Sequence, residues 1–128
     1  MIKPWLFVNE VPGKGKGVFT REAIPADTVI EVSPVIVMPA SDRPHLDKTL
    51  LHDYIFEWQN GCCMALGLIP MYNHSYNSNC EYFMDYEDRT IKVKTVIRIQ
   101  PGEELTINYN GDFDNGKKVW FDEDGDLS

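Results

Sequence analysis

Glycines and prolines recur at short intervals along this chain, and they limit what it can fold into. Both residue types end helices and mark turns, so their spacing favours many short strands over a few long helices. Segments rich in β-branched or aromatic residues stand between the turns, as is typical of strands. The expected strands cover residues 17–20, 28–31, 35–38, 79–84, 90–96 and 104–109.

The expected strand over residues 104–109 has an amphipathic pattern. Leu105, Ile107 and Tyr109 alternate with polar residues, and alternate residues of a strand share one face. Because two of these three side chains are aliphatic, their face should be directed toward the core. Tyr109 is therefore expected to point inward.

Residues 50–58 fit two kinds of secondary structure. Apolar residues within this segment recur at helical spacing, whereas residues 54–57 would also suit a strand. The sequence alone leaves the choice open. A short helical turn is expected just before Asn73, and the acidic residues that follow position 111 are expected to end in a frayed tail.

The length of 128 residues is typical of one domain with one core. No repeat, linker or change in composition divides the chain, so we expect a single domain over residues 1–128, with a core at about 9–113 and an acidic tail at 114–128. The longest apolar run, residues 35–38, is far too short to cross a bilayer. The N-terminus shows no secretory signal, so a cytoplasmic location is expected, or the host nucleus for a viral protein.

The cysteines and the net charge narrow the range of ligands. Cys62, Cys63 and Cys80 are too few for a structural zinc site, so no metal is expected and the thiols should be reduced. The net charge of −8 argues against direct binding of nucleic acid. The same charge would attract a basic partner, although an acidic surface that only maintains solubility explains it equally well.

Three segments carry glycine or polar groups in patterns that point to a ligand site. Residues 13–17 alternate glycine and lysine, which lets a backbone approach a ligand closely, although a plain turn has the same pattern. Residues 72–80 concentrate amide, imidazole and hydroxyl groups, which rarely enter a core unpaired; an Asn-rich surface loop is the alternative. Residues 100–109 form a Pro-Gly turn that leads into the strand ending at Tyr109. Each segment alone is weak evidence for a ligand site, and the presence of all three in one chain is much stronger evidence.

Together the three segments resemble the SET-domain family, and in particular its minimal stand-alone viral and bacterial members, over roughly residues 9–113. Residues 15–19, GKGVF, resemble the family's Gly-x-Gly cofactor motif. Residues 73–80, NHSYNSNC, are similar to Asn-His-Ser-x-x-Pro-Asn-Cys, with Ser78 in place of proline. Residues 103–109, EELTINY, are similar to Glu-Glu-Leu-Thr-x-x-Tyr.

The resemblance implies a mainly β protein with the SET-domain (β-clip) fold, which has several short sheets, short helical turns and a C-terminal pseudoknot. It also implies a protein-lysine N-methyltransferase that transfers methyl groups from S-adenosyl-L-methionine to a lysine of a basic protein, such as a histone or histone-like tail. One alternative is a SET-like module that has lost catalysis and binds a basic peptide. Another is an unrelated small β domain that serves as an interaction surface.

Roles for individual residues follow from the same resemblance. Tyr109 falls on the family's catalytic tyrosine. In larger relatives a cysteine-rich zinc segment closes the channel, but no cysteine follows Cys80 here, so the aromatic residues Phe113, Trp120 and Phe121 are candidates to cover the site. The expected cofactor-binding residues are Gly15, Lys16, Gly17, Asn73, His74 and Trp120, and the expected residues of the substrate-lysine channel are Tyr54, Tyr82 and Ile107. Residues 53–56, DYIF, resemble a segment of the small viral members in which the tyrosine lines this channel; packing in the core is the alternative for both tyrosines.

The resemblance also implies how the methyl group would be transferred to a lysine amine. A lysine amine with a pKa of about 10.4 must lose a proton before it can accept a methyl group. The positive sulfonium of the cofactor disfavours a nearby ammonium, so no dedicated general base is required, and neither the Asn73 motif nor the Tyr109 motif supplies an obvious carboxylate for that role. Tyr109 is expected to orient the amine and to stabilise partial positive charge on the methyl group.

Product multiplicity and oligomeric state stay open. In this family a tyrosine hydroxyl that crowds the amine limits the number of methyl groups added. Ile107 stands where many relatives carry Tyr or Phe, whereas Tyr82 could supply a hydroxyl from a neighbouring strand. These two residues give conflicting indications of how many methyl groups are added. A homodimer is also an open expectation, because small members of the family can dimerise.

Overall fold

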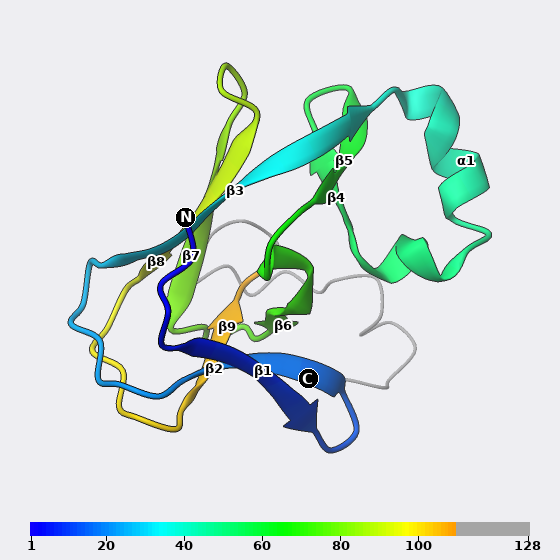
Figure 1. Ribbon diagram of the computed structural model, residues 1–128. Coiled ribbons are helices and arrows are strands. Elements are labelled where there is room, and N and C mark those ends of the chain that lie inside the picture. Colours follow the sequence, from blue (N-terminus) through cyan, green and yellow to red (C-terminus); the bar gives the residue numbers. More distant parts are fainter. Residues whose placement is uncertain (110–128) are drawn as a thin grey trace.

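Two β-sheets form the framework of the part of the chain that the computed structural model describes, residues 1–109 (Figure 1). The smaller sheet has the strand order β1 (Leu6–Val11), β2 (Gly15–Thr20), β9 (Glu104–Ile107) and β6 (Asn73–His74). The larger sheet has the strand order β4 (Ile55–Trp58), β5 (Gly61–Ala65), β3 (Val29–Met38), β8 (Thr90–Thr95) and β7 (Cys80–Asp85).

The helical elements are short and lie mainly between β3 and β4. They are the 3₁₀ turns η1 (Ala40–Asp42), η2 (Leu50–Asp53) and η3 (Ile69–Met71) and the single helical turn α1 (Arg43–Leu46). In the described part of the chain, no helix is long and apolar enough to span a membrane. The expected preference for strands is confirmed.

The strand β3 unites two segments that the sequence suggested as separate strands. Its first part, residues 29–34, pairs with β8, and its second part, residues 35–38, pairs with β5. Pro34 stands where the pairing changes sides. A proline has no N–H to donate, but the carbonyl of Pro34 still accepts a hydrogen bond from the N–H of Leu66 over 3.0 Å. The strand therefore tolerates a residue that would normally end it.

Both interpretations of residues 50–58 apply, each to one half of the segment. The 3₁₀ turn η2 covers the first half and the strand β4 covers the second. The expected helical turn before Asn73 is η3. The strands β1, β5 and β6 were not predicted. The side chains of β1 are largely exposed, and β6, with two residues, is too short for any periodicity.

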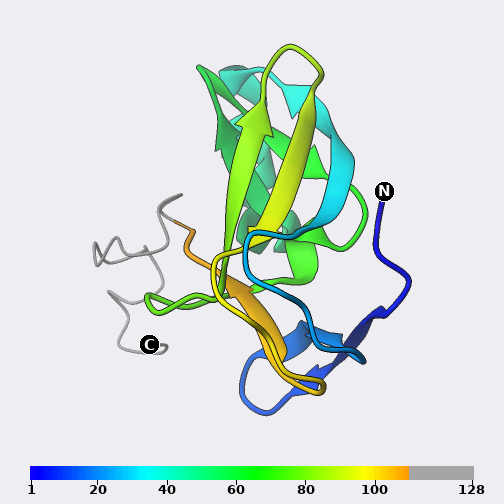
Figure 2. The ribbon, with the colours of Figure 1, turned by 90° about the vertical axis from the view of Figure 1, so that its left-hand side faces the viewer.

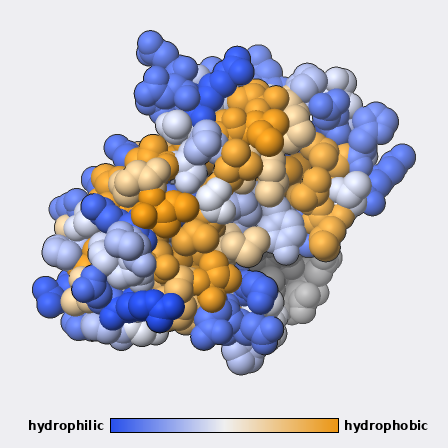
Figure 3. Space-filling view, in the orientation of Figure 1, coloured by the Kyte–Doolittle hydropathy of each residue, from blue (hydrophilic) through white to orange (hydrophobic). Residues whose placement is uncertain are grey.

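One buried cluster joins the two sheets. Val18 and Leu105 from the smaller sheet and Ile91 and Val93 from the larger sheet belong to it, and none of the four is exposed to solvent. The outer surface is mixed, with apolar side chains interrupting the polar ones on the face shown in Figure 3. The large apolar side chains that remain exposed in residues 1–109 are Met1, Ile2, Val8, Ile36, Leu50, Leu51, Leu66, Phe83, Tyr86 and Ile97.

The strand β9 lies between two segments that are far apart in the sequence, and this position brings the motifs together. It pairs antiparallel with β2, with Val18 opposite Leu105, and parallel with β6, with Asn73 opposite Thr106. Figures 1 and 2 both show β9, in orange, beside the blue β2. The glycine motif, the Asn-His motif and the strand that leads to Tyr109 are therefore neighbours in one sheet.

The side chain of Asn79 extends the pairing of β9. Its Oδ1 accepts a hydrogen bond from the N–H of Thr106 over 2.9 Å, and its Nδ2 donates to the carbonyl of Glu104 over 2.9 Å. An amide side chain has both a donor and an acceptor, so it can replace one residue of a strand. Asn79 thus ties the loop that follows β6 to the strand that carries the next motif.

Candidate active site

Tyr109 lies just after β9 and points into the protein. Its hydroxyl donates a hydrogen bond to the carbonyl of Tyr72 over 2.8 Å, and its backbone N–H donates to Nδ1 of His74 over 3.1 Å. The strand ends at Ile107, so the prediction of a strand up to residue 109 was wrong at its end. The hydrogen bond to Tyr72, rather than strand alternation, holds the phenol in its inward direction.

His74 is a buried link between the Asn-His motif and Tyr109. Because its Nδ1 accepts the Tyr109 N–H, the imidazole is in the neutral form that carries its proton on Nε2. Its ring packs edge-on against Tyr76, with centroids 4.4 Å apart, and lies 5.1 Å from the ring of Tyr109. The structure therefore places His74 as a support for residue 109.

Aromatic residues from the larger sheet form a wall beside Tyr109. The ring of Phe56 on β4 lies 6.1 Å from that of Tyr109 and 5.3 Å from that of Tyr82 on β7. The hydroxyl of Tyr82 donates to the carbonyl of Tyr109 over 3.0 Å. Ile107 is fully buried in the core. Sequence reasoning gave a role to Tyr54 but none to Phe56, which lies two residues further on in β4.

The phenols of this wall are kept protonated at neutral pH. Burial is the main cause that raises the pKa of Tyr109, and the nearby groups of Tyr54, Tyr82 and Asp53 raise it further. Burial also raises the pKa of Tyr82 to about 12. A phenol with such a pKa cannot act as a general base near neutral pH. Tyr109 can orient a ligand and present the lone pairs of its oxygen.

The glycine motif forms the other side of the site. Gly15 has a φ of +83°, a conformation that few residues other than glycine adopt. At Gly17 a Cβ would collide with the carboxylate of Glu104 and would lie 2.9 Å from Nδ2 of Asn73. Asn73 donates from this Nδ2 to the carbonyl of Lys16 over 3.1 Å and to Oε2 of Glu104 over 2.6 Å.

Two carboxylates near the site were not identified from the sequence. The Tyr109 motif does supply one, Glu104, but it faces Asn73 and the glycine motif. The other is Glu31 on β3, which is fully buried. Glu31 could have been noticed as a charged residue within a strand of aliphatic residues. Glu104 could have been noticed because it lies beside the inward-facing Leu105 and therefore faces the opposite side of the strand.

Glu31 anchors the segment whose carbonyl holds Tyr109. Its Oε1 accepts from the hydroxyl of Tyr72 over 3.0 Å, and its Oε2 accepts from the backbone N–H of Leu68 and the hydroxyl of Ser33, each over 2.7 Å. Burial is the largest influence and raises the pKa of this carboxyl above its reference value of 4.5, against the three hydrogen bonds, which lower it.

This raised pKa predicts how stability depends on pH. Above pH 4.5, the folded state holds the Glu31 proton more tightly than the unfolded state does, so the free energy of unfolding should fall as pH rises through the folded-state pKa. The Glu31→Gln variant should lose this part of the dependence. Chemical denaturation of both proteins at a series of pH values measures the difference between them.

The matched control is Glu22→Gln, which removes the same charge from an exposed position. Its effect on the free energy of unfolding should be within about 0.5 kcal/mol, because the side chain is exposed. If the difference between the Glu31→Gln variant and the parent protein did not change with pH, burial would not be perturbing the Glu31 carboxyl.

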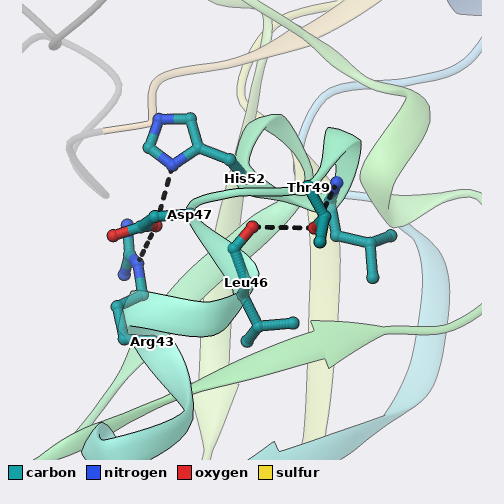
Figure 4. A network of polar contacts seen from close by, with 6 residues as sticks. Arg43, Leu46, Asp47, Thr49 and His52 are labelled. Carbon is teal, nitrogen blue, oxygen red and sulfur yellow. Dashed lines mark hydrogen bonds and ion pairs between the residues drawn. The ribbon is translucent and has the colours of Figure 1, made fainter.

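A polar cluster holds the segment that leads into Tyr54 (Figure 4). Oδ1 of Asp47 accepts a hydrogen bond from Nε of Arg43 over 2.9 Å and lies 2.8 Å from Nδ1 of His52. These contacts, with His52 first and Arg43 second, lower the pKa of Asp47. The side-chain oxygen of Thr49 caps η2. The cluster thus joins α1 to η2, directly before Tyr54.

The structure brings most of the expected site residues into one region. The glycine motif, Asn73, His74 and Tyr109 are linked through the contacts described above, Tyr82 donates to the Tyr109 carbonyl, and Tyr54 is near enough to raise the pKa of Tyr109. Their expected roles toward a cofactor or a lysine stay predictions. Phe113, Trp120 and Phe121 lie outside the described residues. Within residues 1–109, no group of three or more His, Cys, Asp or Glu side chains could hold a metal ion.

Comparisons with known proteins agree with this arrangement. The SET domain family model matches residues 15–110. The chain is 34% identical over 126 residues to the histone-lysine N-methyltransferase, H3 lysine-37 specific, of Schizosaccharomyces pombe. This alignment covers 97% of this chain and 82% of that protein.

Solved structures show the same fold. A candidate histone methyltransferase of Plasmodium falciparum superposes with a TM-score of 0.69 at 25% identity, covering 94% of this chain and 99% of that one. A Polycomb Repressive Complex 2 structure from Chaetomium thermophilum gives a TM-score of 0.71 at 20% identity, over 90% of this chain and 16% of that one, and shows the fold alone.

The chain therefore belongs to the SET-domain family. This membership confirms the resemblance seen in the motifs and the fold class that it implied. It also confirms the class of enzyme, a protein-lysine N-methyltransferase.

Proposed function

We propose that this protein transfers methyl groups from S-adenosyl-L-methionine to a lysine side chain of a basic protein, with Tyr109 as the catalytic residue. The observation that carries the proposal is the position of the Tyr109 phenol. It is directed inward by the Tyr72 carbonyl, while the backbone of the same residue is bonded to His74 of the Asn-His motif. Two motifs of the family thus converge on one residue, Tyr109.

The residues of the glycine motif and of β6 fit the amino-acid end of the cofactor. A Cβ at Gly15 would meet no atom within 4 Å, so the backbone there is open to a ligand. Asn73 uses both of its N–H groups within the protein, which leaves its amide oxygen to accept from an ammonium. Gly15, Lys16, Gly17, Asn73 and His74 would therefore hold the cofactor.

When bound, S-adenosyl-L-methionine supplies the methyl group and a positive sulfonium, beside which a lysine loses its proton more readily. The part of Tyr109 is to orient the amine. Because its own proton is donated to the Tyr72 carbonyl, the phenol oxygen can act toward an amine N–H, and toward partial positive charge on the methyl group, as an acceptor. The raised pKa of Tyr109 keeps it from acting as a base.

Acidic groups near the phenols favour a basic substrate. The charge of Asp53 contributes to the raised pKa of Tyr109, and that of Glu57 contributes to the raised pKa of Tyr82, so both carboxylates lie close to the wall. The net charge of −8 has the same sign. The relative from Schizosaccharomyces pombe is named for histone H3. We infer that a lysine in a histone or histone-like tail is the substrate.

The function is tested by mass spectrometry of a cell lysate incubated with the protein and S-adenosyl-L-methionine carrying an isotopically labelled methyl group. The proposal expects labelled methyl groups on lysine side chains of basic proteins. An inactive SET-like module would show a higher melting temperature with S-adenosylhomocysteine but no transferred label. If the protein showed neither a higher melting temperature with S-adenosylhomocysteine nor any transferred label, the proposed function would be wrong.

The Gly17→Ala variant should bind S-adenosylhomocysteine about tenfold more weakly. The new Cβ would displace the carboxylate of Glu104 and crowd Nδ2 of Asn73, so the contact between Asn73 and Lys16 would be lost. Isothermal titration calorimetry measures the dissociation constant.

Gly13→Ala is the control, because a Cβ at Gly13 meets no atom within 4 Å; unlike Gly17, Gly13 has a positive φ, of 79°. This variant should lose some stability through backbone strain and keep its affinity. Equal affinity of the Gly17→Ala variant and the parent protein would show that the cofactor does not contact this part of β2.

A further inference from the structure

Glu104, Asn73 and the carbonyl of Lys16 form a polar triangle on the edge of the site. Nδ2 of Asn73 is its centre, because this nitrogen donates both to Oε2 of Glu104 over 2.6 Å and to the carbonyl of Lys16 over 3.1 Å. An amide nitrogen has two N–H groups. Both are therefore used.

The triangle determines which way the Asn73 amide faces. If the amide were turned over, its oxygen would stand against the carboxylate of Glu104 and the carbonyl of Lys16, and three acceptors would meet without a proton between them. A carboxylate can only accept when ionised. Glu104 therefore selects the orientation in which the amide oxygen is turned away from it. Within residues 1–109, the hydrogen bonds of the Asn73 side chain are both made by Nδ2, and none is made to its amide oxygen.

Strand pairing keeps Glu104 in this position. Glu104 lies on β9 opposite Phe19 of β2, and Asn73 lies on β6 opposite Thr106 of the same β9. Gly17 of β2 faces both polar groups and has no room for a Cβ. Three strands thus place the three corners of the triangle next to one another, with the Glu104 carboxylate within hydrogen-bonding distance of the Asn73 amide.

We propose that Glu104 is a positioning residue, which holds the Asn73 amide with its oxygen facing the cofactor so that this oxygen accepts a hydrogen bond from the cofactor's α-ammonium. The proposal rests on the proposed function, because it requires S-adenosyl-L-methionine or its product at this site. Glu104 acts through Asn73 and does not itself touch the reacting atoms. The ligand group that depends on Glu104 is accordingly the amine of the amino-acid end, and not the adenosine.

The Glu104→Gln variant tests this by its effect on two ligands. Glutamine keeps the shape but can donate as well as accept, so the Asn73 amide is no longer held in one orientation. Calorimetric titration should show about tenfold weaker binding of S-adenosylhomocysteine. Binding of the same thioether without its α-amino group should be nearly unchanged. The ratio of the two dissociation constants is independent of any loss of folded protein.

Two further variants separate the role of Glu104 from simple charge or structural effects. Glu103→Gln removes the same charge from the adjacent, exposed residue and should leave the ratio at its parent value. In the Asn73→Ala background, Glu104→Gln should no longer change the ratio, because the amide through which it acts is gone. If Glu104→Gln changed the ratio equally in the parent protein and in the Asn73→Ala background, the proposal would be overturned.

The outcomes distinguish this inference from the function on which it rests. If the parent protein bound neither ligand, the proposed function would be wrong and this inference with it. If the parent protein bound S-adenosylhomocysteine but Glu104→Gln weakened both ligands equally, or neither, the proposed function would stand and the positioning role of Glu104 would be wrong.

Discussion

Replacement of Tyr109 by phenylalanine is expected to lower the turnover number for methyl transfer by about a hundredfold to a thousandfold, the size seen when one preorganised polar group is removed from an active site. The variant keeps the ring, and with it the packing against Phe56 and His74. It loses only the hydroxyl, which the Tyr72 carbonyl holds in place. Single-turnover assays with labelled cofactor measure the rate of the chemical step.

Affinity for S-adenosylhomocysteine should stay close to that of the parent protein, because the backbone contact between residue 109 and His74 does not involve the phenol. The control is Tyr86→Phe, which removes a hydroxyl from an exposed tyrosine on the same protein. Its turnover should be unchanged. A Tyr109→Phe variant that turned over at the parent rate would remove the catalytic role of Tyr109.

The Asn79→Ala variant should be destabilised by about 2–4 kcal/mol. The side-chain amide of Asn79 satisfies the N–H of Thr106 and the carbonyl of Glu104, and alanine would leave both backbone groups without this partner. A loss of this size lowers the melting temperature of a chain of this length by roughly 10 °C. Turnover should fall as well, because β9 leads directly to Tyr109.

Asn77→Ala is the control for this change, since Asn77 belongs to the same loop but is exposed. It should alter the free energy of unfolding by less than about 0.5 kcal/mol. Denaturant titration of both variants compares them. If Asn79→Ala were as stable as Asn77→Ala, the amide of Asn79 would not be holding β9, and the connection between the two motifs would need another explanation.

Local patterns predicted most of the strands, because β-branched residues and turns act over short stretches of chain. The strands β2, β7 and β8 were found within one or two residues of their ends. The exceptions have physical reasons. The continuation of β3 through Pro34 depends on a change of pairing partner, and the end of β9 at Ile107 depends on contacts with residues more than thirty positions away.

The pairing of β9 with β6 could not be predicted from patterns. It involves two residues on β6, runs parallel and joins segments about thirty residues apart. Only the resemblance to a family implied it. The roles of Glu31 and Glu104 also required the structure, because each depends on which side chains a strand register places opposite it.

The site residues fall into two groups by how they could be found. Asn73, His74 and Tyr109 belong to motifs, and their contacts agree with the convergence that the motifs implied. Phe56 and Glu31 received no role from the sequence, and they shape the surroundings of Tyr109 through ring packing and through Tyr72. Sequence reasoning identifies residues with specific chemistry, whereas the residues that hold them in place emerge from packing.

The most direct test is a crystal structure of this protein with S-adenosylhomocysteine and a peptide that contains the methylated lysine found in the lysate. The account predicts the lysine nitrogen within hydrogen-bonding distance of the Tyr109 hydroxyl, with the sulfur of the cofactor product on the side of Asn73 and the glycine motif. A lysine bound elsewhere, with the Tyr109 hydroxyl facing only protein atoms, would contradict it.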